Sequence, residues 1–105
     1  MIPIVADKIK EIQAACRKYA VQSLFLIGSA ARTDNQFTLN SDIDFVLQYK
    51  KDKEGLGVKE FDYFELLFEL EKILGKKVDL VVENSIRNYI FKQSIEKDKI
   101  KIYAA

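Results

Sequence analysis

Histidine is absent from the 105 residues of this chain, and cysteine occurs only once. Without histidine, the chain lacks the most common acid–base side chain and the most common zinc ligand, so such chemistry must rest on carboxylates or on a partner protein. The single cysteine, Cys16, excludes a disulfide within the chain. Because Cys16 falls on the apolar stripe of a predicted helix, we expect it to be a small core residue.

Long apolar runs and a charge imbalance are absent as well. No apolar stretch reaches the roughly 18 residues of a membrane span and no signal peptide is found, so we expect a cytoplasmic protein without membrane contact. The 17 basic and 16 acidic residues give a net charge of +1, which does not favour direct binding to nucleic acid. The length and the 49% hydrophobic content predict one compact domain over residues 1–105.

The hydrophobic pattern predicts alternating helices and strands without repeats or linkers. Helices are expected over residues 4–20, from Ser29 to Arg32, in a segment that ends at Leu74 before a glycine cap at Gly75, and over 85–95; strands are expected over 22–27, 43–49, 77–82 and 100–103. Residues 33–40 and 50–59 are predicted connections. This order predicts an α/β fold, a small domain with a mixed sheet and helices packed against it.

Three aspartates lie in or beside the predicted strands. Asp42 and Asp44 stand two residues apart, and residues with that spacing on a strand point to the same face, about 7 Å apart. Asp79 interrupts an apolar run, where an ionised carboxylate is costly unless it is paired or bound to a metal. Two carboxylates with a third on a neighbouring strand form the oxygen-rich site that Mg²⁺ prefers.

A glycine–serine pair precedes these acids in the sequence. Gly28 and Ser29 follow the apolar run 24–27, and glycine lets the backbone approach a phosphate without a clash from Cβ. Ser29 would offer a hydroxyl and an N–H at the start of a short helix. A phosphate-binding turn opposite a carboxylate cluster predicts nucleotidyl transfer.

The order of these motifs resembles the minimal nucleotidyltransferases (MNT) of the polymerase-beta-like superfamily. The resemblance rests on the segments 28–32 (GSAAR), 41–44 (SDID) and 70–81 (LEKILGKKVDLV), and it extends over residues 9–103. The chain departs from the family at Thr33, where a glycine is usual, and in a slightly longer loop before the second motif. The first departure makes the phosphate turn less permissive, and neither removes a carboxylate.

The resemblance implies a Mg²⁺-dependent enzyme that uses ATP and two metal ions. Proteins of that family are often antitoxins that transfer AMP from ATP onto a tyrosine of a HEPN-domain ribonuclease toxin. The implied catalytic and metal-binding residues are Asp42, Asp44 and Asp79, and the implied nucleotide-binding residues are Gly28, Ser29, Arg32 and Ser41. Asp79 would complete the second metal site or take the acceptor's proton. Arg32 could instead form a structural ion pair that holds its loop in place. Ser41 could instead stabilise the turn that precedes its strand.

The helix that ends at Leu74 carries apolar residues on two sides. Its core-facing side is expected to comprise Leu66, Leu70, Ile73 and Leu74. Phe64 and Phe68 fall on nearly the opposite side, with Leu67 at the margin. Exposed apolar patches tend to mark interfaces, so we expect these three residues to contact a partner protein or a second copy of the chain. The alternative is that residues 50–59 fold over the two phenylalanines.

Two other functions remain open at this point. A small-molecule nucleotidyltransferase of the aminoglycoside-modifying kind would share the motifs, but such enzymes usually carry an added helical domain for which 105 residues leave no room. A non-catalytic antitoxin would only occlude its partner. Loss of a carboxylate would have favoured that function, and all three are present.

Overall fold

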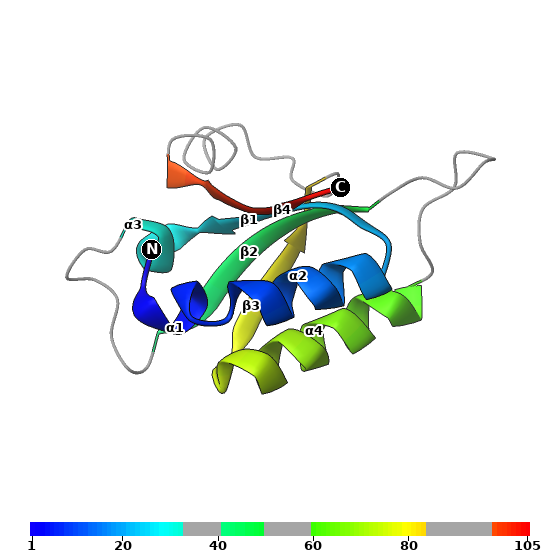
Figure 1. The fold of residues 1–105 in the computed structure, drawn as a ribbon, viewed down its shortest axis with the longest axis horizontal. Helices are drawn as coiled ribbons and strands as arrows, with labels where there is room; N and C mark the ends of the chain where they lie inside the picture. The colour runs from blue at the N-terminus through cyan, green and yellow to red at the C-terminus, as the bar shows by residue number, and fades with distance from the viewer. Residues whose placement is uncertain (33–40, 50–59, 84–97) are drawn as a thin grey trace.

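The computed structural model describes residues 1–32, 41–49, 60–83 and 98–105 (Figure 1). Its helices are α1 (Pro3–Ala6), α2 (Ile9–Lys18), α3 (Gly28–Arg32) and α4 (Glu60–Leu74), and its strands are β1 (Val21–Ile27), β2 (Ile43–Tyr49), β3 (Val78–Val82) and β4 (Ile100–Ala104). These strands agree with the predicted ones to within one residue at either end. The expected helix over 85–95 and the connections over 33–40 and 50–59 lie outside the described residues.

The four strands form one mixed sheet in the order β3–β2–β1–β4. Strand β1 is antiparallel to β2 and β4, whereas β2 is parallel to β3. The end of β1 therefore lies beside the start of β2, which in turn lies beside the start of β3. The register places Ile27 opposite Asp44, and Asp44 opposite Asp79. This topology confirms the predicted mixed sheet and places Asp44 and Asp79 next to each other at one end of it.

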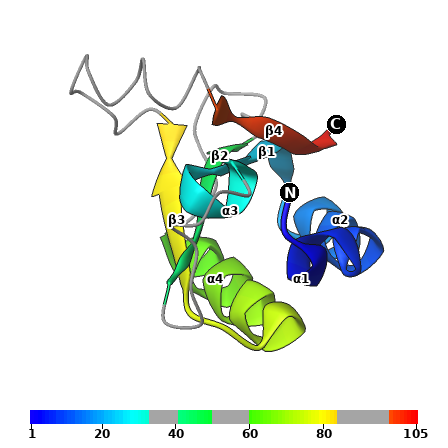
Figure 2. The same ribbon diagram turned by 90° about the vertical axis from the view of Figure 1, so that its left-hand side faces the viewer.

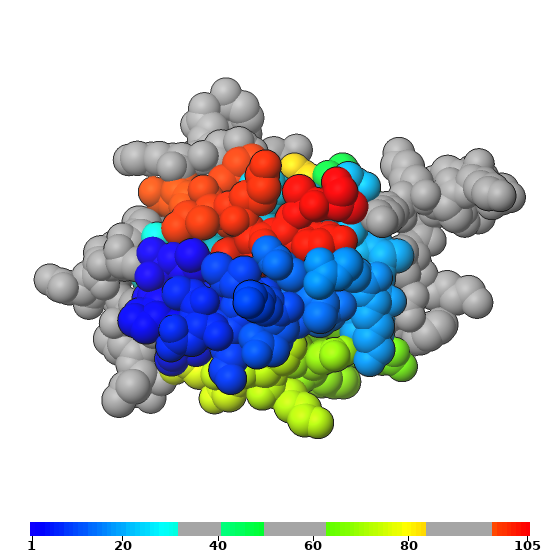
Figure 3. Space-filling view, viewed as in Figure 1, coloured from blue at the N-terminus to red at the C-terminus, as the bar shows by residue number. Residues whose placement is uncertain are grey.

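Helices α1, α2 and α4 cover one face of the sheet (Figures 1 and 2). Helix α2 contacts β1 and β4, α4 contacts β3, and the two helices contact each other. In the space-filling view, α2 fills the strip between β4 and α4 (Figure 3). Helix α3 is separate from this layer and contacts β1 and β2.

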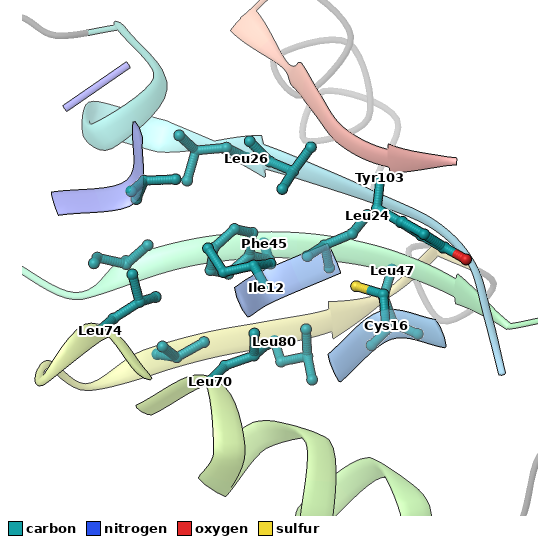
Figure 4. Packing of buried hydrophobic residues seen from close by; sticks show 14 of the residues in the cluster. Ile12, Cys16, Leu24, Leu26, Phe45, Leu47, Leu70, Leu74, Leu80 and Tyr103 are labelled. Atoms are coloured by element: carbon teal, nitrogen blue, oxygen red, sulfur yellow. The ribbon is translucent and has the colours of Figure 1, made fainter. Parts of the chain in front are cut away.

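The core lies between the sheet and the helices (Figure 4). Alternate residues of β2, namely Ile43, Phe45 and Leu47, are fully buried in it, as the period of two along a strand requires. Helix α4 contributes Leu66, Leu70 and Leu74, with Ile73 half-buried beside them. Cys16 of α2 is fully buried, which confirms its predicted core role. Burial raises the pKa of its thiol to about 12, so the thiol stays protonated and unreactive.

The first helical segment differs from the predicted single helix over 4–20. The chain forms α1 and α2 instead, with residues 7–8 between them. The Ile2 N–H donates to the Ala30 carbonyl at 3.2 Å, so the start of the chain is tied to α3. The apolar pattern over residues 4–20 is compatible with α1 and α2 as well as with one helix, and it therefore could not reveal the break.

Helix α4 ends at Leu74 as expected. Gly75 follows with a φ of 65° and donates its N–H to the Glu71 carbonyl at 2.8 Å, which is the left-handed cap that favours glycine. Within the described ranges, no helix is long and apolar enough to cross a membrane.

Candidate active site

Asp44 lies on the sheet face opposite the helices. It alternates with Ile43 and Phe45, which are buried beneath the helices, so its side chain points to the other face. Asp79 is its register partner on β3, and neighbouring strands lie about 5 Å apart. The Asp44 side chain is half-buried and the Asp79 side chain is exposed. The structure therefore brings these two carboxylates side by side at the end of the sheet.

Asp42 lies just before β2 and is exposed. Burial, followed by the negative charges of Asp79 and Asp42, raises the pKa of the Asp44 carboxyl to about 6. The Asp44 carboxyl is therefore close enough to Asp79 and Asp42 to be affected by the charges of both. Neighbouring like charges of this kind are typical of functional sites.

The three carboxylates suit a hard divalent cation in their chemistry. Carboxylate oxygens are the ligands that Mg²⁺ prefers, and a cation would offset the charges of Asp79 and Asp42, which add to the effect of burial on the pKa of Asp44. Within the described residues, no three acidic, cysteine or histidine side chains are gathered closely enough to hold an ion as they stand.

Gly28 brings the backbone close to the Asp44 carboxylate. It begins α3 with a φ of 72°, a conformation that favours glycine. A Cβ at this position would lie 2.7 Å from Oδ2 of Asp44, too close for any real side chain. Glycine is thus needed for the conformation of the turn and for the position of the Asp44 carboxylate. The sequence had suggested only the approach of a phosphate.

The other predicted nucleotide-binding residues lie at the same end of the sheet. Ser29 is half-buried in α3, directly after Gly28, and Ser41 is half-buried just before β2. Arg32 is the last residue of α3, and its side chain lies outside the described atoms. The buried Ala30 and Ala31 attach α3 to the core.

Tyr63 of α4 contacts the strand that carries Asp79, and no pattern in the sequence had pointed to this residue. Its hydroxyl donates a hydrogen bond to the carbonyl of Leu80, the residue after Asp79. Burial and then the negative charge of Asp79 raise the pKa of the Tyr63 hydroxyl. A tyrosine within an aromatic helical segment has no sequence motif, so only the packing of α4 against β3 reveals it.

The two phenylalanines of α4 form an exposed aromatic patch. The exposed fractions of Phe64 and Phe68 are 48% and 62%, and their ring centroids lie 6.4 Å apart. Leu67 is half-buried and packs against the core. The patch of Phe64 and Phe68 is therefore open to another molecule, with Leu67 beneath its margin. The alternative covering segment, residues 50–59, lies outside the described residues.

The raised pKa of Asp44 predicts a pH-dependent stability of the metal-free protein. Below the ordinary aspartate value near 4 the carboxyl is protonated in both the folded and unfolded states, so it imposes no penalty. As the pH rises through that value and past the folded value of about 6, ionisation destabilises the folded state. After allowance for solvent screening, we expect a penalty of about 1–2 kcal/mol at pH 7.

Urea denaturation in EDTA tests this expectation. Asp44→Asn removes the charge and should be more stable than the wild type at pH 7, whereas the two proteins should converge near pH 4. A variant that is less stable by the same amount at both pH values would show that Asp44 is a structural hydrogen-bond acceptor instead.

Comparison with known proteins places this site in a family. A family model described as a nucleotidyltransferase domain matches residues 8–102. A relative from Methanocaldococcus jannaschii, provisionally named a protein adenylyltransferase, is 43% identical over 86 residues, which cover 81% of this chain and 80% of the relative.

Two solved structures share the fold. One, provisionally described as a minimal nucleotidyltransferase, has a TM-score of 0.74 and 22% identity and covers 91% of this chain and 90% of its own. A second is a chain from a complex of a tri-AMPylated Shewanella oneidensis HEPN toxin with an MNT antitoxin. Its TM-score is 0.65 and its identity 19%, and the match covers 95% of this chain and 72% of that chain. The domain match, the relative and the arrangement of Gly28, Asp44 and Asp79 agree: the chain belongs to the nucleotidyltransferase family.

Proposed function

We propose that this protein is a Mg²⁺-dependent protein adenylyltransferase that transfers AMP from ATP onto a tyrosine hydroxyl of a HEPN ribonuclease toxin and thereby acts as its antitoxin. The observation that carries the proposal is the placement of Asp44 beside Asp79 and against Gly28 in a nucleotidyltransferase domain. The protein acceptor is supported by the name of the relative and by the AMPylated HEPN toxin in the complex of similar fold.

The transfer replaces one phosphorus–oxygen bond with another. The acceptor hydroxyl oxygen bonds to the α-phosphorus of ATP, and pyrophosphate leaves with the electron pair of the broken bond. Asp79, exposed at the end of the sheet, would accept the hydroxyl proton.

Gly28 and Ser29 would hold the triphosphate, and Asp42 and Asp44 would hold Mg²⁺. Bound Mg²⁺ supplies charge neutralisation at the entering and leaving oxygens. The remaining proposed nucleotide contacts are Arg32 and Ser41.

The aromatic patch of Phe64 and Phe68 is the proposed docking surface for the toxin, with Leu67 at its margin. Phe64 packs edge-to-face against Tyr63, with 5.2 Å between the ring centroids, and Tyr63 lies beside the strand that carries Asp79. A toxin bound to the patch would therefore contact α4, the helix that packs against the strand carrying Asp79. This arrangement favours a hetero-oligomer, and a homodimer through the same patch is the alternative.

Changing Phe64 and Phe68 to Ser tests the docking surface. Both side chains are exposed, so we expect the thermal midpoint to stay close to that of the wild type. If the two rings are central anchors, binding to the toxin should weaken by about 2 kcal/mol or more, which is about thirtyfold in Kd. Calorimetric titration measures the affinity, and a collapsed thermal midpoint would show instead that the rings belong to the core.

A substoichiometric inactivation assay distinguishes catalysis from occlusion. The purified HEPN ribonuclease is incubated with a small molar fraction of this protein, ATP and Mg²⁺, and RNA cleavage is followed over time. A catalytic antitoxin should inactivate nearly all of the ribonuclease, and only when ATP is present. Inhibition that stops at the molar fraction added and needs no ATP would support occlusion, and a small-molecule enzyme would not inhibit at all.

A further inference from the structure

Two side chains of α4 hold β3 on either side of Asp79. The Tyr63 hydroxyl donates to the carbonyl of Leu80, and the Val78 N–H donates to Oε2 of Glu71 at 3.0 Å. Val78 and Leu80 are the immediate neighbours of Asp79 in the sequence. Helix α4 therefore grips the strand at the two residues that flank the third carboxylate.

The Val78 N–H and the Leu80 carbonyl point away from β2, toward the outer edge of the sheet. The Lys77 carbonyl accepts a hydrogen bond from the Ile43 N–H at 3.0 Å, so the backbone groups of Lys77 face β2. Because successive residues of a strand alternate, those of Val78 and Leu80 face outward. In the sheet that the described residues form, β3 is an outer strand. The α4 side chains therefore take the place that a further strand would occupy at this edge.

The position of Asp79 depends on its backbone. Its side chain is exposed, so packing of the side chain itself does not fix where the carboxylate lies. The backbone of β3 is held by β2 on the inner side and by Tyr63 and Glu71 on the outer side. Loss of either outer contact would release the strand next to the carboxylate while leaving the pairing with β2 intact.

We propose that Tyr63 and Glu71 are positioning residues for Asp79, which they hold in place by fixing the outer edge of β3 at the two flanking residues. The inference rests on the proposed function, in which Asp79 acts on the acceptor hydroxyl. Displacement of a catalytic group by about 1 Å can lower a rate by about a hundredfold. A loss of this kind falls on the chemical step and leaves ATP binding unchanged.

Steady-state kinetics of transfer to the toxin provide the first test. Tyr63→Phe removes only the hydroxyl and keeps the ring against Phe64, and Glu71→Ala removes the acceptor for the Val78 N–H. Each should lower kcat about tenfold or more with KM for ATP unchanged. Glu71→Gln keeps an acceptor oxygen and should retain the wild-type kcat. Glu69→Gln is the matched control, because Glu69 lies on the same helix but pairs with Lys18 at 3.5 Å.

A double-mutant cycle separates positioning from a general structural role. In an Asp79→Asn background, Tyr63→Phe should cause no further loss of kcat, because its effect passes through Asp79. Equal losses in both backgrounds, or a wild-type kcat for Tyr63→Phe and Glu71→Ala, would overturn the inference while leaving the proposed function intact. An absence of transfer by the wild-type protein would overturn the proposed function and this inference with it.

Discussion

Asp44→Asn and Asp42→Asn are each expected to lower the rate of AMP transfer by about 10³-fold or more. Asparagine keeps the size of the side chain but removes the charge that would hold a cation. Asp44 should be the more sensitive of the two, because it is half-buried beside Asp79, whereas Asp42 is exposed. The measurement is the initial rate of label transfer from ATP to the toxin in Mg²⁺, with EDTA as the metal-free comparison.

Asp7→Asn is the matched control for this experiment. Asp7 is exposed between α1 and α2, which cover the sheet face opposite to Asp44 (Figures 1 and 2), and its loss should leave the rate unchanged. The Asp42→Asn, Asp44→Asn double variant should be folded by circular dichroism. Transfer by that double variant at the wild-type rate would contradict the metal-binding role of both carboxylates.

Gly28→Ala is the second change for which we expect a large effect. The residue has a φ of 72°, and a left-handed conformation costs an alanine roughly 1–2 kcal/mol. The new Cβ would also lie 2.7 Å from Oδ2 of Asp44, so the carboxylate has to move. Since a small displacement at a reacting centre is costly, we expect transfer to fall about a hundredfold. The initial rate and the urea midpoint are measured together.

Gly75→Ala separates the two effects of that substitution. Gly75 has a similar φ of 65°, but a Cβ there would meet nothing within 4 Å. The control should therefore show a similar loss of stability with an unchanged transfer rate. If both alanine variants lose activity to the same extent, backbone strain alone accounts for the loss, and the contact with Asp44 has no functional role.

Much of the fold follows from local patterns in the sequence. The strands coincide with short, mainly apolar segments, and the end of α4 is marked by a glycine in a left-handed cap. Helix α4 was predicted to have an apolar side and a second side with Phe64 and Phe68, and the structure leaves those two residues exposed. The break between α1 and α2 was missed because the apolar pattern over residues 4–20 is compatible with one helix as well as with two.

The site was predictable only in part, because its contacts join residues that are far apart in the sequence. The spacing of Asp42 and Asp44 places them on one strand face, but the pairing of Asp44 with Asp79 depends on the register of two strands far apart in sequence. The hydrogen bonds of Tyr63 and Glu71 with β3 depend on where α4 packs beside that strand. Neither contact leaves a trace in the local sequence.

The central claim, transfer of AMP from ATP to a tyrosine of the toxin, is tested most directly by comparing two labelled forms of ATP. One carries the label on the α-phosphate and the other on the γ-phosphate, and each is incubated with this protein, Mg²⁺ and the HEPN toxin. The account predicts that the α-label alone appears on the toxin and that peptide mapping finds it on a tyrosine. Transfer of the γ-label, or a toxin that stays unlabelled while it is inhibited, would contradict the account.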